Sequence, residues 1–295
     1  MGKDLAERFS QARDVFEVVD EALGFALSRL MWEGPESDLT LTHNAQPAIL
    51  THSLAAYAVV RDVLQPVAGA GHSLGEYSAY VAAGTFALTD AARLVRRRGE
   101  LMYQAGRQRS GSMAAVIGLP AERVVDACRE ASGDGAVVVA ANLNAPDQVV
   151  ISGDPAAVER AGTRLKEVGA KRVLPLKVSG AFHSPLMEPA ELGLREELDR
   201  VEFANPSFPV IANATAELVT DASTARRLLG EQLTAPVRWA ASMQRAAEEA
   251  GAGSRFVEIG PGTVLTGLLR RVVSGAPCTP LGTADQVTRF MEQHA

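Results

Sequence analysis

The sequence predicts an α/β protein with a mainly parallel sheet and one inserted subdomain. Three observations support this prediction. Apolar segments of strand length alternate with segments of helical periodicity along most of the 295 residues. A serine flanked by glycines, Ser73, follows one apolar segment and precedes a helical one. Residues 113–178 show a different order of elements, strand-helix-strand-strand-helix-strand.

The region before Ser73 is predicted to be helical. Apolar residues recur at helical spacing over 15–30, and Gly34-Pro35 ends that helix. A second helix is expected to begin at Pro47, because proline is favoured in a first turn, and to run to about residue 64. A short strand at 67–70 then leads to the serine.

Helices and strands continue to alternate after the serine. Thr89 is predicted to cap a helix that carries four arginines. The inserted unit is predicted to have strands at 113–118, 137–143, 148–152 and 172–178 and helices at 121–131 and 155–168. Later elements are expected at 186–198 (helix), 209–212 (strand), from 236 (helix) and 255–259 (strand). Residues 1–112 and 179–295 thus form the large domain, and 113–178 form a ferredoxin-like subdomain.

Composition excludes several classes of function. The net charge of −6 argues against a nucleic-acid-binding protein, which would need a basic surface. Two cysteines allow neither a disulfide framework nor a cysteine-rich zinc site, and no metal site is expected. The charged N-terminus lacks an apolar signal core, and no apolar run is long enough to span a membrane. We therefore expect a cytoplasmic protein that binds neither nucleic acid nor membrane.

The motif Gly71-His72-Ser73-Leu74-Gly75 fits a hydrolase-like nucleophile elbow. Glycines two residues before and after the serine let the backbone turn sharply, which holds the hydroxyl away from the sheet. The amide of Leu74, at the start of the next helix, could donate a hydrogen bond to a developing oxyanion. The alternative is that glycine and serine simply form a turn, and the strand-turn-helix context favours the catalytic interpretation.

A serine nucleophile needs a base, and five histidines are available. His183 is the best candidate, because it follows a predicted strand in a turn of small residues, where sheet proteins place active-site side chains. A structural or surface role for this histidine stays open at this point.

Four separated motifs resolve these alternatives: GHSLGEYSA, RRRGELM, VSGAFHSPLM and VEIGPGTVLTGLLRR. In this order and spacing they resemble the malonyl-CoA:acyl carrier protein transacylases and the related acyltransferase domains of polyketide synthases. The resemblance covers essentially the whole chain. It implies that Ser73 is the nucleophile, His183 the base, and Gln232 the residue whose backbone carbonyl orients the histidine.

The resemblance also implies how the acyl group is recognised. Arg98 is expected to pair with the free carboxylate of the malonyl group, since guanidinium offers two parallel donors. Phe182 is expected to narrow the pocket, which favours malonyl over methylmalonyl. Three further residues are expected to bind the substrate: Gln46, Asn144 and Asn213.

The implied reaction is malonyl transfer in fatty-acid synthesis, from malonyl-CoA through a seryl ester to the phosphopantetheine thiol of acyl carrier protein. No cofactor is required, and a monomer is expected. Both partners are anionic, so a basic rim is expected on the acidic protein. Its candidate residues are Lys171, Arg172, Arg270 and Arg271.

One departure from the family pattern concerns the first residues. Members of the family begin with a strand that ends in a segment of the type FPGQGSQ, whose backbone supplies a second oxyanion donor. The sequence beginning at Met1 resembles the part of those proteins that comes just after this segment. Either the true start lies upstream or the product is impaired; we expect a truncated start, because every other site residue is present.

Two alternative functions remain open. The first is a serine esterase or thioesterase, which would need an acidic residue between serine and histidine, such as Asp154, and would give no reason for Arg98. The second is an impaired homologue that only binds carrier protein.

Overall fold

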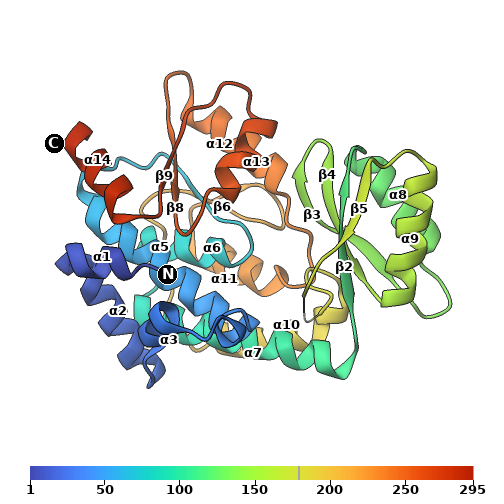
Figure 1. Ribbon diagram of the computed structural model, residues 1–295, viewed down its shortest axis with the longest axis horizontal. Coiled ribbons are helices and arrows are strands. Elements are labelled where there is room, and N and C mark those ends of the chain that lie inside the picture. The colour runs from blue at the N-terminus through green and yellow to red at the C-terminus, as the bar shows by residue number, and fades with distance from the viewer. Residues whose placement is uncertain (179, 295) are drawn as a thin grey trace.

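The strands of the larger lobe form two separate groups in the computed structural model, which describes residues 1–178 and 180–294 (Figure 1). In the first group, β1 (Gly69–Ala70) pairs in parallel with β6 (Val210–Ile211), which pairs antiparallel with β7 (Leu218–Val219). The second group is the parallel pair of β8 (Phe256–Ile259) and β9 (Cys278–Leu281). The protein is an α/β protein as predicted, but a single mainly parallel sheet is not what the described residues form.

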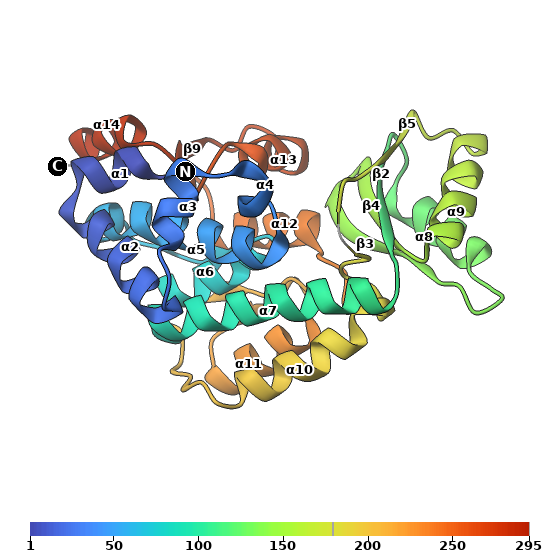
Figure 2. The ribbon, with the colours of Figure 1, turned by 60° about the horizontal axis from the view of Figure 1, so that its bottom comes forward.

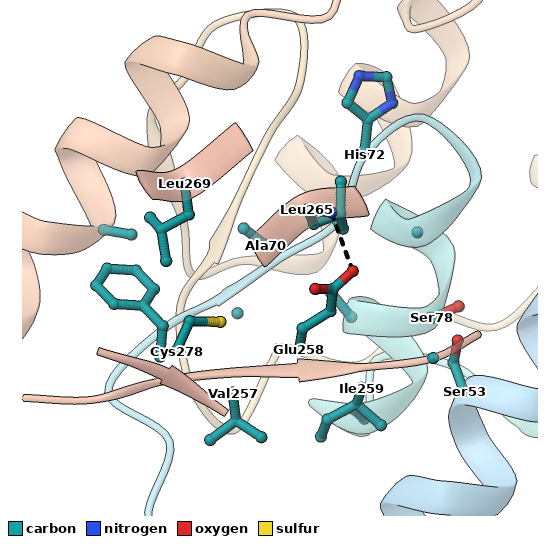
Figure 3. A pocket seen from close by; sticks show the side chains of 18 of the residues that line it. Ser53, Ala70, His72, Ser78, Val257, Glu258, Ile259, Leu265, Leu269 and Cys278 are labelled. Atoms are coloured by element: carbon teal, nitrogen blue, oxygen red, sulfur yellow. Dashed lines mark hydrogen bonds between the residues drawn. The ribbon is translucent and has the colours of Figure 1, made fainter. Parts of the chain in front are cut away.

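A cavity of about 750 Å³ lies between the two groups of strands, at the edges of β1 and β8 (Figure 3). Residues 68–71 line it on one side and residues 255–260 on the other. Because β1 pairs only with β6 and β8 only with β9 among the described strands, the facing edges of β1 and β8 do not hydrogen-bond to each other. The cavity reaches the predicted elbow, since His72 and Leu74 also line it.

Helices surround both groups of strands. Their bounds are α1 (Lys3–Arg8), α2 (Ser10–Leu23), α3 (Leu27–Glu33), α4 (Glu36–Leu39), α5 (Thr42–Val60), η1 (Arg61–Val63), α6 (Leu74–Ala82), α7 (Leu88–Gln108), η2 (Pro185–Met187), α10 (Glu188–Leu198), α11 (Ala222–Glu231), α12 (Trp239–Ala250), α13 (Val264–Val272) and α14 (Ala284–His294). Helix α5 is buried on most of its surface and packs against α2, α6 and α7, which makes it the centre of the main core.

Several predicted helices have different bounds in the structure. The helix that Thr89 was expected to cap begins one residue earlier, at Leu88, and the helix expected from residue 236 begins at Trp239. The helix expected over 15–30 is divided, because Gly24 adopts a left-handed conformation (φ 72°) that ends α2. Helix α5 begins at Thr42, so Pro47 lies inside the helix instead of in its first turn. No helix in the described ranges is long and apolar enough to cross a membrane.

The smaller lobe contains the order of elements that the sequence predicts. It consists of β2 (Ser112–Ile117), α8 (Ala121–Ala131), β3 (Val138–Ala145), β4 (Gln148–Gly153), α9 (Pro155–Glu167) and β5 (Arg172–Pro175). The strands form an antiparallel sheet in the order β3-β4-β2-β5, and both helices cover the face that points away from the larger lobe (Figure 2). The lobe has its own apolar core between that face and the helices.

The sheet of the smaller lobe is joined to the larger lobe along β3. The amide of Leu143 donates to the carbonyl of Val237, and the amide of Val237 donates to the carbonyl of Ala141. Phe182 packs near Met113 and Val150 on the sheet face that is turned toward the larger lobe. The smaller lobe is thereby fixed beside the segment that carries His183.

Candidate active site

Ser73 lies at a sharp turn between β1 and α6, with φ 51° and ψ −105°. A non-glycine residue adopts this left-handed conformation only at a cost, and such strain is typical of functional sites. Gly71 is required for the turn, because a Cβ atom added there would lie 1.9 Å from the carbonyl carbon of Gly75. The backbone therefore turns sharply at Ser73, between a short strand and a helix.

His183 lies within hydrogen-bond distance of the serine, as predicted. Its Nε2 atom is 2.7 Å from Ser73 Oγ, and its Nδ1 atom is 3.0 Å from the backbone carbonyl oxygen of Gln232. A carbonyl can only accept, so Nδ1 carries the proton and Nε2 is free to accept the serine proton. Burial, with a smaller contribution from the positive charge of Arg98, lowers the pKa of His183 to about 3, which keeps the imidazole neutral.

Of the five arginines on α7, Arg98 alone is buried, with 1% of its surface exposed. Its Nη2 atom donates to Ser73 Oγ at 3.0 Å and to Gln232 Oε1 at 2.8 Å. Its Nη1 atom donates to Gln46 Oε1 at 2.6 Å. A cation thus lies directly beside the hydroxyl that would attack, held by neutral partners.

The remaining predicted residues divide into two sets. Leu74 is the first residue of α6, where a helix leaves its amide without an intrahelical acceptor, and Phe182 directly precedes His183 and is half-buried. Gln46 does not face solvent: in addition to accepting from Arg98, it donates to Thr42 Oγ1 at 3.0 Å. These three residues border the Ser73–His183 pair or its arginine.

The two asparagines that were expected to bind the substrate hydrogen-bond to residues of the turn around Ser73. Asn213 accepts from the amide of Ser73 at 2.6 Å and donates to the carbonyl of Gly71 at 2.7 Å. Because both of its polar side-chain atoms hydrogen-bond to backbone groups of the turn, Asn213 stabilises the turn. Asn144, from β3, has its Oδ1 atom 2.8 Å from Nε2 of His72, the residue before the serine.

Glu76 is a buried residue of the site that sequence reasoning missed. Only 1% of its surface is exposed, and its Oε2 atom accepts from Gln232 Nε2 at 2.7 Å and from the amide of Asn213 at 3.1 Å. Burial raises its pKa to about 7. The available signal was a single acidic residue in the otherwise uncharged segment 74–82.

The described residues contain no cluster of three or more histidine, cysteine, aspartate or glutamate side chains that could hold a metal ion. Asp154, the acidic candidate for a hydrolase triad, lies in the smaller lobe, where its carboxylate accepts two hydrogen bonds from Arg109 at 2.8 Å. His183 has a backbone carbonyl as its partner in place of a carboxylate. The site is therefore a serine-histidine pair with an adjacent buried arginine.

Comparisons with known proteins agree with this chemistry. Residues 1–293 match the acyl transferase domain family. The malonyl CoA-acyl carrier protein transacylase of Bacillus subtilis (strain 168) is 45% identical over 273 residues, which cover 92% of this chain and 86% of that relative. The protein with the same name from Escherichia coli (strain K12) is 41% identical over 291 residues, which cover 98% and 93%.

Two solved structures are similar over nearly their whole length. An acyl carrier protein S-malonyltransferase from Vibrio cholerae has a TM-score of 0.94 and 41% identity, covering 98% of this chain and 94% of that one. A malonyl-transacylase in complex with its type II polyketide synthase acyl-carrier protein has a TM-score of 0.94 and 40% identity, covering 99% and 94%. With a family match over almost every residue and relatives at 40% identity or more, the chain belongs to the acyl transferase family.

Proposed function

We propose that this protein transfers the malonyl group of malonyl-CoA to the phosphopantetheine thiol of acyl carrier protein in fatty-acid synthesis. The observation that carries the proposal is the distance of 2.7 Å between Ser73 Oγ and His183 Nε2, with Arg98 Nη2 at 3.0 Å from the same oxygen. The names of the relatives, which are malonyl transacylases of acyl carrier protein, support the same reaction.

The first half of the reaction forms a seryl ester. His183 takes the hydroxyl proton as Ser73 Oγ attacks the thioester carbonyl of malonyl-CoA. The amide of Leu74 is placed at the positive end of α6 to donate to the oxyanion, and the guanidinium of Arg98 binds the free carboxylate of the malonyl group. The oxyanion then collapses, and the CoA sulfur leaves as a thiol with the proton from His183.

The second half reverses these steps with another thiol. His183 takes the proton of the phosphopantetheine thiol, whose sulfur attacks the malonyl ester, and then returns the proton to Ser73 Oγ. No metal or redox group is needed, because bonds are exchanged between oxygen and sulfur with one proton shuttled by one imidazole. We take the enzyme to act as a monomer.

The finer features of the fold belong to the same proposal. We infer that Ser73 occupies a hydrolase-like nucleophile elbow and that residues 113–178 are a ferredoxin-like subdomain inserted between residues 1–112 and 179–295. The order β3-β4-β2-β5 with two helices on one face supports the second inference. Phe182, between this sheet and His183, is suited to limit the width of the acyl pocket.

The test is to incubate the full chain with radiolabelled malonyl-CoA, with and without acyl carrier protein bearing its phosphopantetheine. We expect label on Ser73 without the carrier and label on the carrier when it is added, and neither with Ser73→Ala. Release of free malonate as the only product would instead indicate an esterase or thioesterase. Binding of the carrier without any ester would indicate an impaired homologue.

A further inference from the structure

Two charged side chains are fully buried beside the nucleophile. Among the aspartate, glutamate, lysine and arginine residues of the described ranges, only Glu76 and Arg98 fall in this class, each with 1% of its surface exposed. The two do not form a direct ion pair. The side-chain amide of Gln232 connects them: its Oε1 atom accepts from Arg98 at 2.8 Å, and its Nε2 atom donates to Glu76 at 2.7 Å.

Each member of this pair also has one atom without a hydrogen-bond partner. The Oε1 atom of Glu76 and the Nε atom of Arg98 are both buried and unpaired in the described structure. A buried ion needs an opposite charge nearby, because the protein interior solvates it poorly. Among the described residues of the site, the carboxylate of Glu76 is the buried negative charge available to balance the guanidinium.

We propose that Glu76 is the counter-ion of Arg98 in the enzyme without substrate, and that it takes up a proton when the carboxylate of an acyl group binds Arg98. The inference rests on the proposed function, since it requires an acyl group with a charged end. Glu76 is therefore a positioning residue that keeps the number of buried charges balanced in both states of the enzyme.

The number of buried charges supports this role. With an acyl carboxylate bound, one buried cation would face two buried anions, and the anion that does not touch the guanidinium directly is the one that becomes neutral. A pKa near 7 makes this change possible at little cost near neutral pH. Protonation also gives the unpaired Oε1 atom a hydrogen to donate, while Oε2 still accepts from Gln232.

The other titratable groups around Glu76 do not compete for the proton. Burial raises the pKa of Tyr77 to about 12 and raises that of Tyr80 further, so both phenols are neutral. The pKa of His183, lowered to about 3, keeps the imidazole neutral. Arg98 stays charged, since guanidinium does not lose its proton in proteins.

The proton balance gives a direct measurement. Acylation exchanges the O–H of serine for the S–H of CoA, so it releases no proton by itself. If Glu76 takes one proton from solvent, formation of the malonyl ester is accompanied by uptake of about half a proton per ester at pH 7, rising toward about one at pH 8.

The experiment mixes the full chain with stoichiometric malonyl-CoA in weak buffer containing a pH indicator, and quantifies the ester on Ser73 by mass spectrometry in the same sample. Acetyl-CoA is the matched substrate control, because its acyl group lacks the carboxylate. Glu76→Gln is the matched protein control, because the amide has the shape of the carboxyl but cannot take up the proton. We expect the excess uptake only for the unsubstituted chain with malonyl-CoA.

The outcomes separate this inference from the proposed function. Stoichiometric malonyl ester without excess proton uptake, or with equal uptake in Glu76→Gln, would overturn the role of Glu76 and leave malonyl transfer intact. Failure to form any ester would overturn both. A second readout needs no variant: the ratio of kcat/KM for malonyl-CoA to that for acetyl-CoA should fall about fivefold from pH 7 to pH 8, and a constant ratio would contradict the inference.

Discussion

The Nδ1 atom of His183 lies 3.0 Å from the backbone carbonyl oxygen of Gln232, so a neutral acceptor sets the orientation of the imidazole. The same residue binds Arg98 through its side chain. One position thus orients both the base and the cation, through chemically independent groups. Substitutions can separate the two roles, because changing a side chain leaves the backbone carbonyl in place.

We expect Gln232→Ala to impair transfer of malonyl more than transfer of acetyl. The substitution removes one of the three acceptors of Arg98 but keeps the acceptor of His183, so malonyl kcat/KM should fall about tenfold, the effect of one hydrogen bond to a charged group. Steady-state kinetics with both CoA esters measure this. His183→Ala is the control, since loss of the base should lower both activities by about a thousandfold or more. Equal losses in Gln232→Ala would contradict the separation.

Arg98→Ala should lose malonyl transfer while the relative activity with acetyl-CoA rises. The malonyl carboxylate would then be buried without a partner, which predicts a fall in kcat/KM of about a hundredfold or more. Arg98→Lys keeps the charge but loses the two parallel donors, and we expect an intermediate value. Competition between malonyl-CoA and acetyl-CoA in one reaction gives the ratio directly, and a ratio unchanged by either substitution would exclude the role of Arg98 in recognition.

The conformation of Ser73 predicts an unusual effect of glycine. At φ 51° and ψ −105° a side chain is strained, whereas glycine is not. Ser73→Gly should therefore be more stable than Ser73→Ala by about 1 kcal/mol in urea unfolding, although glycine normally destabilises a chain relative to alanine. Both variants lack the nucleophile and should form no ester. Greater stability of the alanine variant would show that the elbow is not strained.

The local parts of the site could be predicted from the sequence, and the parts made by distant residues could not. Ser73, Gly71 and Leu74 are adjacent in the chain, so one motif specifies their turn. Glu76 follows in the same helix as Leu74, but its hydrogen-bond partner Gln232 lies 156 residues away. The contact of Asn213 with the backbone of Ser73 and Gly71 could not be predicted either, because these residues are brought together only by the folded chain.

The sheet was the least predictable part of the fold. Strand β1 has two residues and β8 has four, and such short apolar segments do not specify their partners. The alternation of elements predicted a single sheet, whereas a cavity lies between the edges of β1 and β8. The order of strands and helices in the smaller lobe was predicted correctly, because these elements are longer and their periodicity is clear.

The pKa of Glu76 predicts how stability depends on pH. Its folded value of about 7 lies above the ordinary value of 4.5, so between these pH values the folded state binds more protons than the unfolded state. The resulting stability is present below pH 4.5 and is lost as the pH rises through 7. Relative to Glu76→Gln, the unsubstituted chain should therefore lose on the order of 3 kcal/mol of unfolding free energy from pH 4.5 to pH 8.

Urea unfolding of both proteins across this pH range gives the difference. Other titrating groups, including His183, are common to both chains and cancel to first order. If the difference in unfolding free energy between the two proteins is independent of pH, Glu76 titrates at its ordinary pKa in the folded state. If the unsubstituted chain instead becomes more stable than Glu76→Gln as the pH rises, the folded protein stabilises the charged form of the carboxylate.

The cavity between β1 and β8 predicts different reactivities for the two cysteines. Cys278 lines this cavity and is partly exposed, whereas Cys128 is buried in the core of the smaller lobe (Figure 3). Burial raises the pKa of both thiols, to about 12 for Cys128, so neither is a strong nucleophile and access decides the order of reaction. Iodoacetamide should label Cys278 first and Cys128 only after unfolding in urea, as measured by peptide mass spectrometry. Equal labelling of the two cysteines in the native state would contradict this order; it would show either that the cavity is closed to small reagents or that the smaller lobe opens. As a control, Cys278→Ser should leave the slow labelling rate of Cys128 unchanged.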